Sequence, residues 1–224
     1  MIRASSYVPI PLLFTLLLSP PCLSFAGKAP PDDVRNAAQV GINVILKDSR
    51  MGNLHRLGFQ SQEDIDSANL GKGFQIFTIP PDKLLNETTP LNLQALVTPT
   101  NQWQFLIAAG DKAKALLTVE FVDGKWIPVS IGSAALAKEL SDFLDAWPAS
   151  SGYDYRLIRV FQAKSEFIEL TKGGKVIGIV SLSSLSLATS RGEAEAANLR
   201  GLRDSNEVLS ELKFIVRNHL QFNK

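Results

Sequence analysis

The residues that could carry catalysis in this chain are few, and they lie far apart in the sequence. The two histidines are His55 and His219. A hydrolytic triad needs a histidine beside a nucleophile and an orienting acid. His219 falls on the apolar row of a predicted C-terminal helix, where histidine usually packs, and His55 stands in a predicted loop. These placements assign no catalytic residue, and the chain is predicted not to be an enzyme.

A serine nucleophile and a metal site are the next chemistries to consider. Ser133 follows Gly132 where a strand is expected to turn into a helix. A nucleophile elbow needs glycine two residues on either side of the serine, and Ile131 and Ala135 stand there. We therefore expect Ser133 to cap the helix. The acidic cluster at 63–66 lacks the spacing and glycine of a calcium loop, and two separated histidines do not suit zinc. No metal and no cofactor are predicted.

Aromatic side chains near loops offer binding chemistry instead. Trp103, Trp126, Tyr153 and Tyr155 fall at the starts of predicted strands, beside polar loops. Aromatic rings at such junctions can stack on sugars or anchor a peptide. The alternative is that they fill the core of the sheet. These four residues are the candidate binding residues.

The first 26 residues have the pattern of a secretory signal. Arg3 precedes the apolar run Ile10–Leu18, and small residues end at Ala26. The run is shorter than the roughly 20 residues that span a bilayer, so we expect cleavage after Ala26, with a retained anchor as the alternative. Cys22 would leave with the signal, and the mature chain would then lack cysteine. The predicted location is secreted or periplasmic, with no integral membrane segment after signal removal.

The charge balance of the chain excludes one class of partner. The sequence has 23 basic and 22 acidic residues, and loss of Arg3 with the signal brings the mature chain to zero net charge. Nucleic-acid binding depends on an excess of Lys and Arg facing the phosphates. We therefore predict no nucleic-acid partner.

Hydrophobic periodicity predicts helices at both ends of the mature chain and strands between them. The predicted helices cover about 32–47, a short stretch after Ser61, 133–147 and the segment after Asp204. Val40 and Val44 widen the apolar stripe of the first helix, so we expect that helix to be well covered. The predicted strands cover about 73–79, 103–107, 113–121, 126–131, 155–162, 166–171 and 175–182.

Two hairpin signals, at Asp123-Gly124 and Gly173-Gly174, suggest an internal repeat. The sequence on each side of them predicts strand, strand, turn, strand and helix. The expected fold is α+β, with antiparallel sheets from two β-β-β-α units at about 101–148 and 153–222. These units would lie within one domain, 27–224, packed with the N-terminal and C-terminal helices. Pro128 predicts that its strand is an edge strand or carries a bulge.

Three functions are compatible with these patterns. The first is an exported, non-enzymatic binding or accessory domain that engages a protein or peptide through an open sheet face or edge. The second is a sensor or carrier for a small molecule or glycan, suggested by the aromatic residues. The third is an envelope hydrolase that uses a serine or carboxylates.

Overall fold

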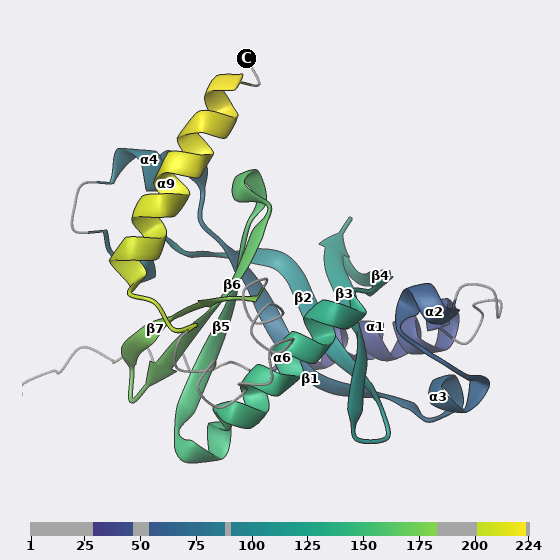
Figure 1. Ribbon diagram of the computed structural model, residues 1–224. Helices are drawn as coiled ribbons and strands as arrows, with labels where there is room; N and C mark the ends of the chain where they lie inside the picture. The colour runs from purple at the N-terminus through teal and green to yellow at the C-terminus, as the bar shows by residue number, and fades with distance from the viewer. Residues whose placement is uncertain (1–28, 47–53, 88–90, 183–200, 223–224) are drawn as a thin grey trace, which may run out of the picture.

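A seven-stranded sheet organises the chain (Figure 1). The computed structural model describes residues 29–46, 54–87, 91–182 and 201–222. The signal predicted at 1–26, with Cys22, lies outside the described residues. The strands are β1 (Ala68–Thr78), β2 (Thr98–Ala109), β3 (Lys112–Val122), β4 (Lys125–Gly132), β5 (Tyr153–Val160), β6 (Ser165–Lys172) and β7 (Lys175–Ser181).

Helices precede, interrupt and follow these strands. They are α1 (Asp32–Gly41), the π-helix η1 (Ile42–Leu46), α2 (Leu54–Leu57), α3 (Gln62–Asp66), α4 (Pro81–Asn86), α5 (Leu93–Leu96), α6 (Ala134–Ala146), the 3₁₀ turns η3 (Ala149–Ser151) and η4 (Phe161–Ala163), and α9 (Ser205–Phe222). The short helix predicted after Ser61 is present as α3, and the Ser61 hydroxyl caps it by accepting a hydrogen bond from the Asp64 N–H. The α+β class is therefore shown.

The sheet is mixed, which corrects the expectation of purely antiparallel pairing. Its strand order is β4-β3-β2-β1-β5-β6-β7. Every neighbouring pair is antiparallel except β1 and β5, which run parallel and pair at Ile76–Leu157 and Phe77–Ile158. A parallel pair needs a long crossover connection. Here β2, β3, β4 and α6 all lie between the two strands in the sequence, and short-range turn signals do not reveal such a pairing.

Both predicted hairpin turns have the backbone that their residues favour. Asp123 and Gly124 have φ values of 49° and 80°, and Gly173 and Gly174 have 57° and 76°. Mirror-image hairpin turns need positive φ at both central residues, which glycine adopts freely and aspartate tolerates. These turns connect β3 to β4 and β6 to β7, so each outer strand of the sheet is fixed by a local signal.

The prediction for Pro128 is confirmed in both of its forms. β4 is an edge strand of the sheet. Its register against β3 also shifts between the pairs Thr118–Ser130 and Val119–Pro128, so Val129 is the extra residue of a bulge. Proline cannot donate a ladder hydrogen bond and is confined to edges and bulges.

Three apolar clusters cover the two faces of the sheet. α1 packs on one face of β2, β3 and β4, against residues such as Phe105 and Leu117. α9, α4 and α5 pack on the same face at the other end, against Ile158 and Phe167. α6 covers the opposite face, against Leu116 and Leu157. Because Leu157 and Ile158 are adjacent in one strand, their side chains point to opposite faces, which places α6 and α9 on different sides.

The helix positions leave the predicted division into two units unconfirmed. In chain order β2-β3-β4-α6 is followed by β5-β6-β7-α9, as the turn spacing suggested. The strand triplets flank β1 in mirrored order. However, the two helices lie on opposite faces, and part of the second unit, 183–200, lies outside the described residues. The β-β-β-α units at 101–148 and 153–222 therefore remain a prediction.

Two local expectations are wrong. Val40 and Val44 were expected to be covered, yet their side chains are 51% and 54% exposed. Ser133 was expected to cap α6, yet its side chain makes no capping hydrogen bond. Its backbone is left-handed, with φ 58° and ψ 49°. A helix-capping serine has an extended backbone that aims the hydroxyl at the first turn, and the left-handed conformation at Ser133 does not provide this.

A buried ion pair lies on the α9 side of the sheet. Arg156 of β5 and Glu169 of β6 face each other across the ladder, with Nε and Oε2 3.2 Å apart. Both residues are buried, and the guanidinium lies 5.1 Å from the centre of the Phe77 ring. Burial raises the pKa of Glu169 and lowers that of Arg156, and in each case it outweighs the attraction of the partner. Desolvation therefore dominates the energetics of this pair.

Candidate functional sites

The four predicted aromatic residues divide between two places. Trp103 is 3% exposed and belongs to the core beneath α1. Trp126 is half-buried against the same core, and its ring lies 5.2 Å from that of Phe121 at a tilt of 56°. Tyr153 and Tyr155 lie in β5, in the cluster packed by α6. The structure thus brings Tyr153 and Tyr155 together, whereas Trp103 and Trp126 lie in a different cluster.

Tyr153 and Tyr155 form a cluster with the C-terminal end of α6. The Tyr155 hydroxyl donates a hydrogen bond to the carbonyl of Trp147. The Trp147 and Tyr153 rings meet edge to face, with centroids 5.1 Å apart. Lys72 Nζ lies 4.3 Å from the centre of the Tyr155 ring, and Lys172 Nζ lies 4.4 Å from that of Tyr153. Cation–π contacts therefore already engage both tyrosine rings.

Burial shifts the pKa of two groups in this cluster. It raises the pKa of the Tyr155 hydroxyl, and the charge of Asp154 acts in the same direction. It lowers the pKa of Lys72, although Asp154 opposes that change. Both shifts have desolvation as their main cause, which is the expected result for polar groups packed among rings. The cluster fixes the start of β5 against α6.

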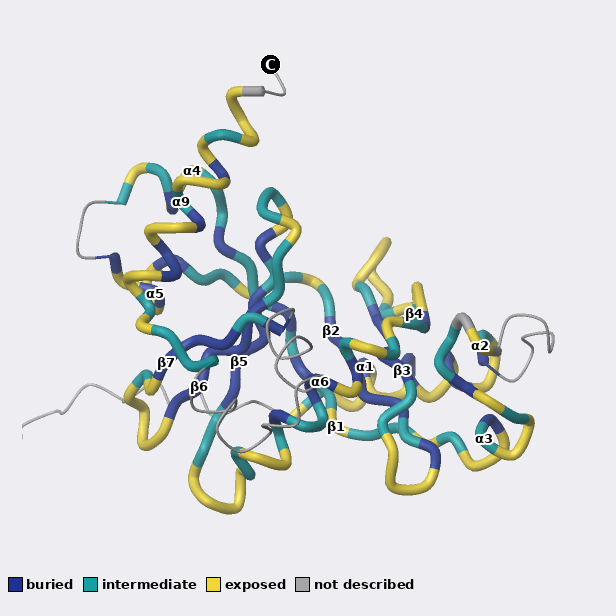
Figure 2. Tube along the Cα trace, viewed as in Figure 1, coloured by how far each residue is buried: buried dark blue, intermediate teal, exposed yellow. Residues whose placement is uncertain are grey.

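Exposed apolar side chains gather at the β4 end of the sheet. Among the described residues, six of the eleven large exposed hydrophobic residues lie on α1, η1 or the β3–β4 hairpin. They are Val40, Val44, Phe121, Val122, Ile127 and Val129. Figure 2 shows that most residues of β4 and its hairpin are exposed or only partly buried. Phe121 pairs with Trp126 of the core under α1, so the neighbouring Val122 and Ile127 point to the opposite, α6 face of the hairpin. We call the other four residues, Val40, Val44, Phe121 and Val129, the α1–β4 surface.

Close packing of α1 on β4 connects the two parts of this surface. A Cβ atom on Gly41 would lie 2.7 Å from the Pro128 Cβ and 2.9 Å from a methyl group of Leu117. Only glycine permits that approach. Val40 precedes Gly41, and Val44 follows one helical turn after Val40 on the same flank. The exposed side chains therefore run from the flank of α1 to the edge strand.

The α1–β4 surface is also nearly free of charge. The sequence from Asn36 to Leu46 has no charged residue, and neither has the sequence from Trp126 to Ala137. Asp123 and Lys125 stand at the tip of the hairpin, beside Phe121 and Val122. Uncharged, apolar centres with a polar rim are typical of protein interfaces. A partner that bound at the centre of this surface would therefore remove no charged side chain from water.

The backbone of β4 is a poor template for an added strand. In a two-residue hairpin the flanking residues, here Val122 and Lys125, form a bonded pair, and bonded and non-bonded pairs then alternate. The backbones of Trp126 and Pro128 consequently point away from β3. Proline has no N–H, so Trp126 provides the one outward donor over residues 125–128. Proline and a bulge are known ways to blunt a sheet edge. The surface therefore offers side-chain packing rather than strand pairing.

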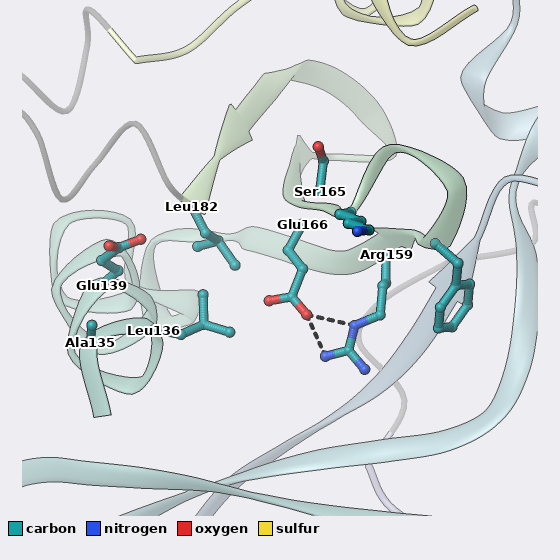
Figure 3. Close-up of a pocket in the computed structure, with 9 residues that line it drawn as sticks. Ala135, Leu136, Glu139, Arg159, Ser165, Glu166 and Leu182 are labelled. Carbon is teal, nitrogen blue, oxygen red and sulfur yellow. Dashed lines mark hydrogen bonds and ion pairs between the residues drawn. The ribbon is translucent and has the colours of Figure 1, made fainter. Parts of the chain in front are cut away.

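A groove lies on the α6 face, between the first turns of α6 and the β5–β6 hairpin (Figure 3). Its volume is about 520 Å³. It is lined by Ala135, Leu136, Glu139, Arg159, Phe161, Lys164, Ser165, Glu166 and Leu182. Cavities of about 300 to 1,000 Å³ with mainly apolar walls and a few polar groups are the usual size for small ligands.

An ion pair forms the polar wall of this groove. Arg159 Nε donates to Glu166 Oε1 at 2.5 Å, and its Nη2 pairs with the same oxygen. Nη1 lies 3.5 Å from Gln102 Oε1. In Figure 3 the second carboxylate oxygen of Glu166 points toward Leu136 of α6. The groove thus sets donors and an acceptor side by side, opposite an apolar wall.

The two histidines lie on different elements and are both exposed. His55 belongs to the short helix α2, where a loop was expected, and His219 belongs to α9. Figure 1 places these helices at opposite ends of the molecule. Across the described part of the chain, no group of three or more His, Cys, Asp or Glu side chains could hold a metal ion. Asp64, from the acidic cluster at 63–66, pairs with Lys114 at 3.0 Å.

Sequence reasoning passed over the α1–β4 surface and the groove. Val40 and Val44 were the signal for the surface, but the apolar stripe that they widen was interpreted as a sign of burial. The groove had no such signal, because its walls come from separate segments, 135–139, 159–166 and the end of β7. Within the described ranges, no helix combines the length and apolar character needed to cross a bilayer. The chain matches no family model, no curated protein and no solved structure.

Proposed function

We propose that this chain is an exported, non-enzymatic binding domain that holds a protein partner on the α1–β4 surface. The observation that supports the proposal is that four exposed apolar residues, Val40, Val44, Phe121 and Val129, lie on a surface without charge at its centre. Monomeric proteins rarely leave large contiguous apolar patches in water, and such patches commonly mark sites of interaction.

The partner that fits is a folded protein with an apolar, uncharged surface of its own. Pro128 and the bulge at Val129 argue against an extended peptide that would pair with β4. Val40 of α1 and Val44 of η1 lie one turn apart and form a ridge of side chains, and such ridges pack into grooves of a second helix or onto a sheet. Asp123 and Lys125 would lie at the rim of the contact and contribute little to its affinity.

Photo-cross-linking tests this proposal. A photoreactive residue at Val44 or at Val129 should link the chain to the same partner in the cells that produce it. The matched control is Phe214, which is 66% exposed on α9 and has charged or polar residues one helical turn away, at 210, 211, 217 and 218. Linking from Phe214 with equal yield, or linking only between two copies of the chain, would overturn the proposal.

A pair of variants tests whether the apolar side chains provide the affinity. Val40→Asp with Val44→Asp should abolish the cross-link from Val129, because two charges would then be desolvated on contact. Phe214→Asp should leave it unchanged. Thermal melts of both variants should show that the free chains remain folded, since all three positions are exposed.

Export and internal organisation belong to the same proposal. We expect cleavage after Ala26, delivery to a secreted or periplasmic location, and a mature domain at 27–224. Mass spectrometry of the chain from the exported fraction should find Gly27 at the N-terminus. Recovery of the chain with residues 1–26 intact would contradict cleavage. The division into two β-β-β-α units is supported by the element order and the matching hairpin turns.

A further inference from the structure

We propose that the groove between α6 and the β5–β6 hairpin binds a small neutral amphiphile, with an alkyl or aryl body and a hydroxyl or primary amide head. The groove lies on the α6 face of the sheet, whereas α1 packs on the opposite face. The inference is therefore independent of the function proposed for the α1–β4 surface.

The walls of the groove determine the body of the ligand. Ala135 and Leu136 of α6 and Leu182 after β7 form an apolar wall, and the Phe161 side chain is 48% exposed at the hairpin end. Each methylene group moved from water onto such a wall contributes about 0.8 kcal/mol. A volume of about 520 Å³ accepts a body of several carbon atoms with space for a head group.

The charges of the groove determine the head. Its four charged residues are Arg159, Lys164, Glu139 and Glu166, whose formal charges cancel. A charged ligand would lose hydration without meeting an excess of the opposite charge. In Figure 3 the Glu139 carboxylate lies beyond Leu136, away from the Arg159–Glu166 pair.

The Arg159–Glu166 pair determines the hydrogen bonding. Glu166 Oε1 is bound to Arg159, while its other oxygen points toward the apolar wall (Figure 3). A guanidinium has five N–H donors, and the bonds to Glu166 and the contact with Gln102 account for three of them. A head group that both donates and accepts can bond to both partners. Hydroxyl and primary amide groups have this property, whereas a carboxylate only accepts and an ammonium only donates.

Three probes with the same six-carbon chain test the head group. Hexanamide, hexanoate and hexylamine are titrated into the full chain, and binding is measured from backbone amide shifts of Leu136 and Glu166. We expect hexanamide to bind at least about tenfold more tightly than either charged probe. Equal or tighter binding of hexanoate or hexylamine would overturn the head-group assignment, and absence of shifts with all three would overturn the site.

Two matched variants on α6 test the location. Ala135→Phe should fill the groove and weaken hexanamide binding by about tenfold or more. Ala146→Phe places the same side chain at an exposed position at the other end of the helix and should leave binding unchanged. Both positions are exposed, so both variants should fold, which their thermal melts verify. Equal affinity of the two variants for hexanamide would overturn the assignment to this groove.

Discussion

The two ends of the sheet are completed in different ways. At the β7 edge, Ile179 and Arg203 exchange both backbone hydrogen bonds, of 3.0 and 2.9 Å. Arg203 is then held by Glu207 and Glu211 of α9, at 2.8 Å each. At the β4 edge, Pro128 and a bulge discourage pairing, and apolar side chains are left in water. One edge is thus closed by the chain itself, and the other is free for a partner.

The cores behind these edges also differ in their content of charged residues. The core under α1 is lined by apolar residues, and the core under α9 includes the buried pair Arg156–Glu169 close to Phe77. The outer faces show the same contrast. The solvent side of α1 is uncharged beyond Arg35, whereas that of α9 carries Glu207, Glu211 and Arg217. Charge is therefore found inside and outside the sheet at the α9 end, and it is absent where contact is proposed.

The largest expected effect comes from breaking the buried pair. Glu169→Ala should lower the free energy of unfolding by about 3 to 5 kcal/mol, because Arg156 would keep a buried charge without its counter-ion. Glu166→Ala breaks the pair with Arg159 on the same strands, whose side chains are 20% and 21% exposed, and should cost about 1 kcal/mol or less. Chemical denaturation measures both. Equal losses would show that burial does not distinguish the two pairs.

Replacement of both partners should give a smaller effect with a defined pH dependence. We expect Arg156→Leu with Glu169→Leu to be within about 2 kcal/mol of the natural chain at neutral pH. Burial holds the pKa of Glu169 above its ordinary value, so the folded state binds this proton more tightly than the unfolded state does. The stability that Glu169 contributes is therefore lost as pH rises through its folded pKa. Relative to the double variant, the natural chain should lose stability as pH rises, and a difference that stays constant would contradict the shift.

Each edge strand contains a glycine, and the two glycines permit a matched test of whether the Ile179–Arg203 bridge closes the β7 edge. A Cβ on Gly178 of β7 would lie 2.6 Å from Leu202 Cγ and 2.9 Å from the Arg203 carbonyl oxygen, whereas a Cβ on Gly132 of β4 would meet nothing within 4 Å. Gly178→Ala should cost about 1 to 3 kcal/mol and speed hydrogen exchange at the Ile179 amide. Gly132→Ala should change stability by less than about 1 kcal/mol. Unchanged exchange at Ile179 in Gly178→Ala would show that the bridge does not close this edge.

The smallest expected effect concerns the open end. Val40→Ser with Val44→Ser should change the free energy of unfolding of the isolated chain by about 0.5 kcal/mol or less at each position, because both side chains are already in water. Chemical denaturation of the chain without its partner measures this. A loss of several kcal/mol would mean that the two valines support the fold, and it would remove the reason to assign them to an interface.

Local signals in the sequence determined much of this fold. The turn residues Asp123-Gly124 and Gly173-Gly174 located both outer hairpins, and Pro128 identified an edge. These predictions succeeded because each depends on the backbone preference of one or two residues. The parallel contact of β1 with β5 depends on segments about eighty residues apart, and no residue type marks it.

The candidate sites were harder to predict for a related reason. The sequence alone does not distinguish an apolar residue that packs in the core from one, such as Val44, that is exposed and available for a partner. The aromatic residues were singled out by type, and the structure places Trp103 in the core. The Arg159–Glu166 wall depends on a cross-strand register that becomes visible only when β5 and β6 are paired.

The short parallel contact between β1 and β5 has a consequence for the order of assembly. Each outer strand triplet contains only hairpin neighbours, whose loops are short and close quickly. The junction between them rests on the pairs Ile76–Leu157 and Phe77–Ile158, with the Thr78 hydroxyl donating to the Arg159 carbonyl at 2.8 Å. It must wait until a long stretch of chain has already folded. We expect this seam to form late, and under tension to be where the two halves of the molecule first separate.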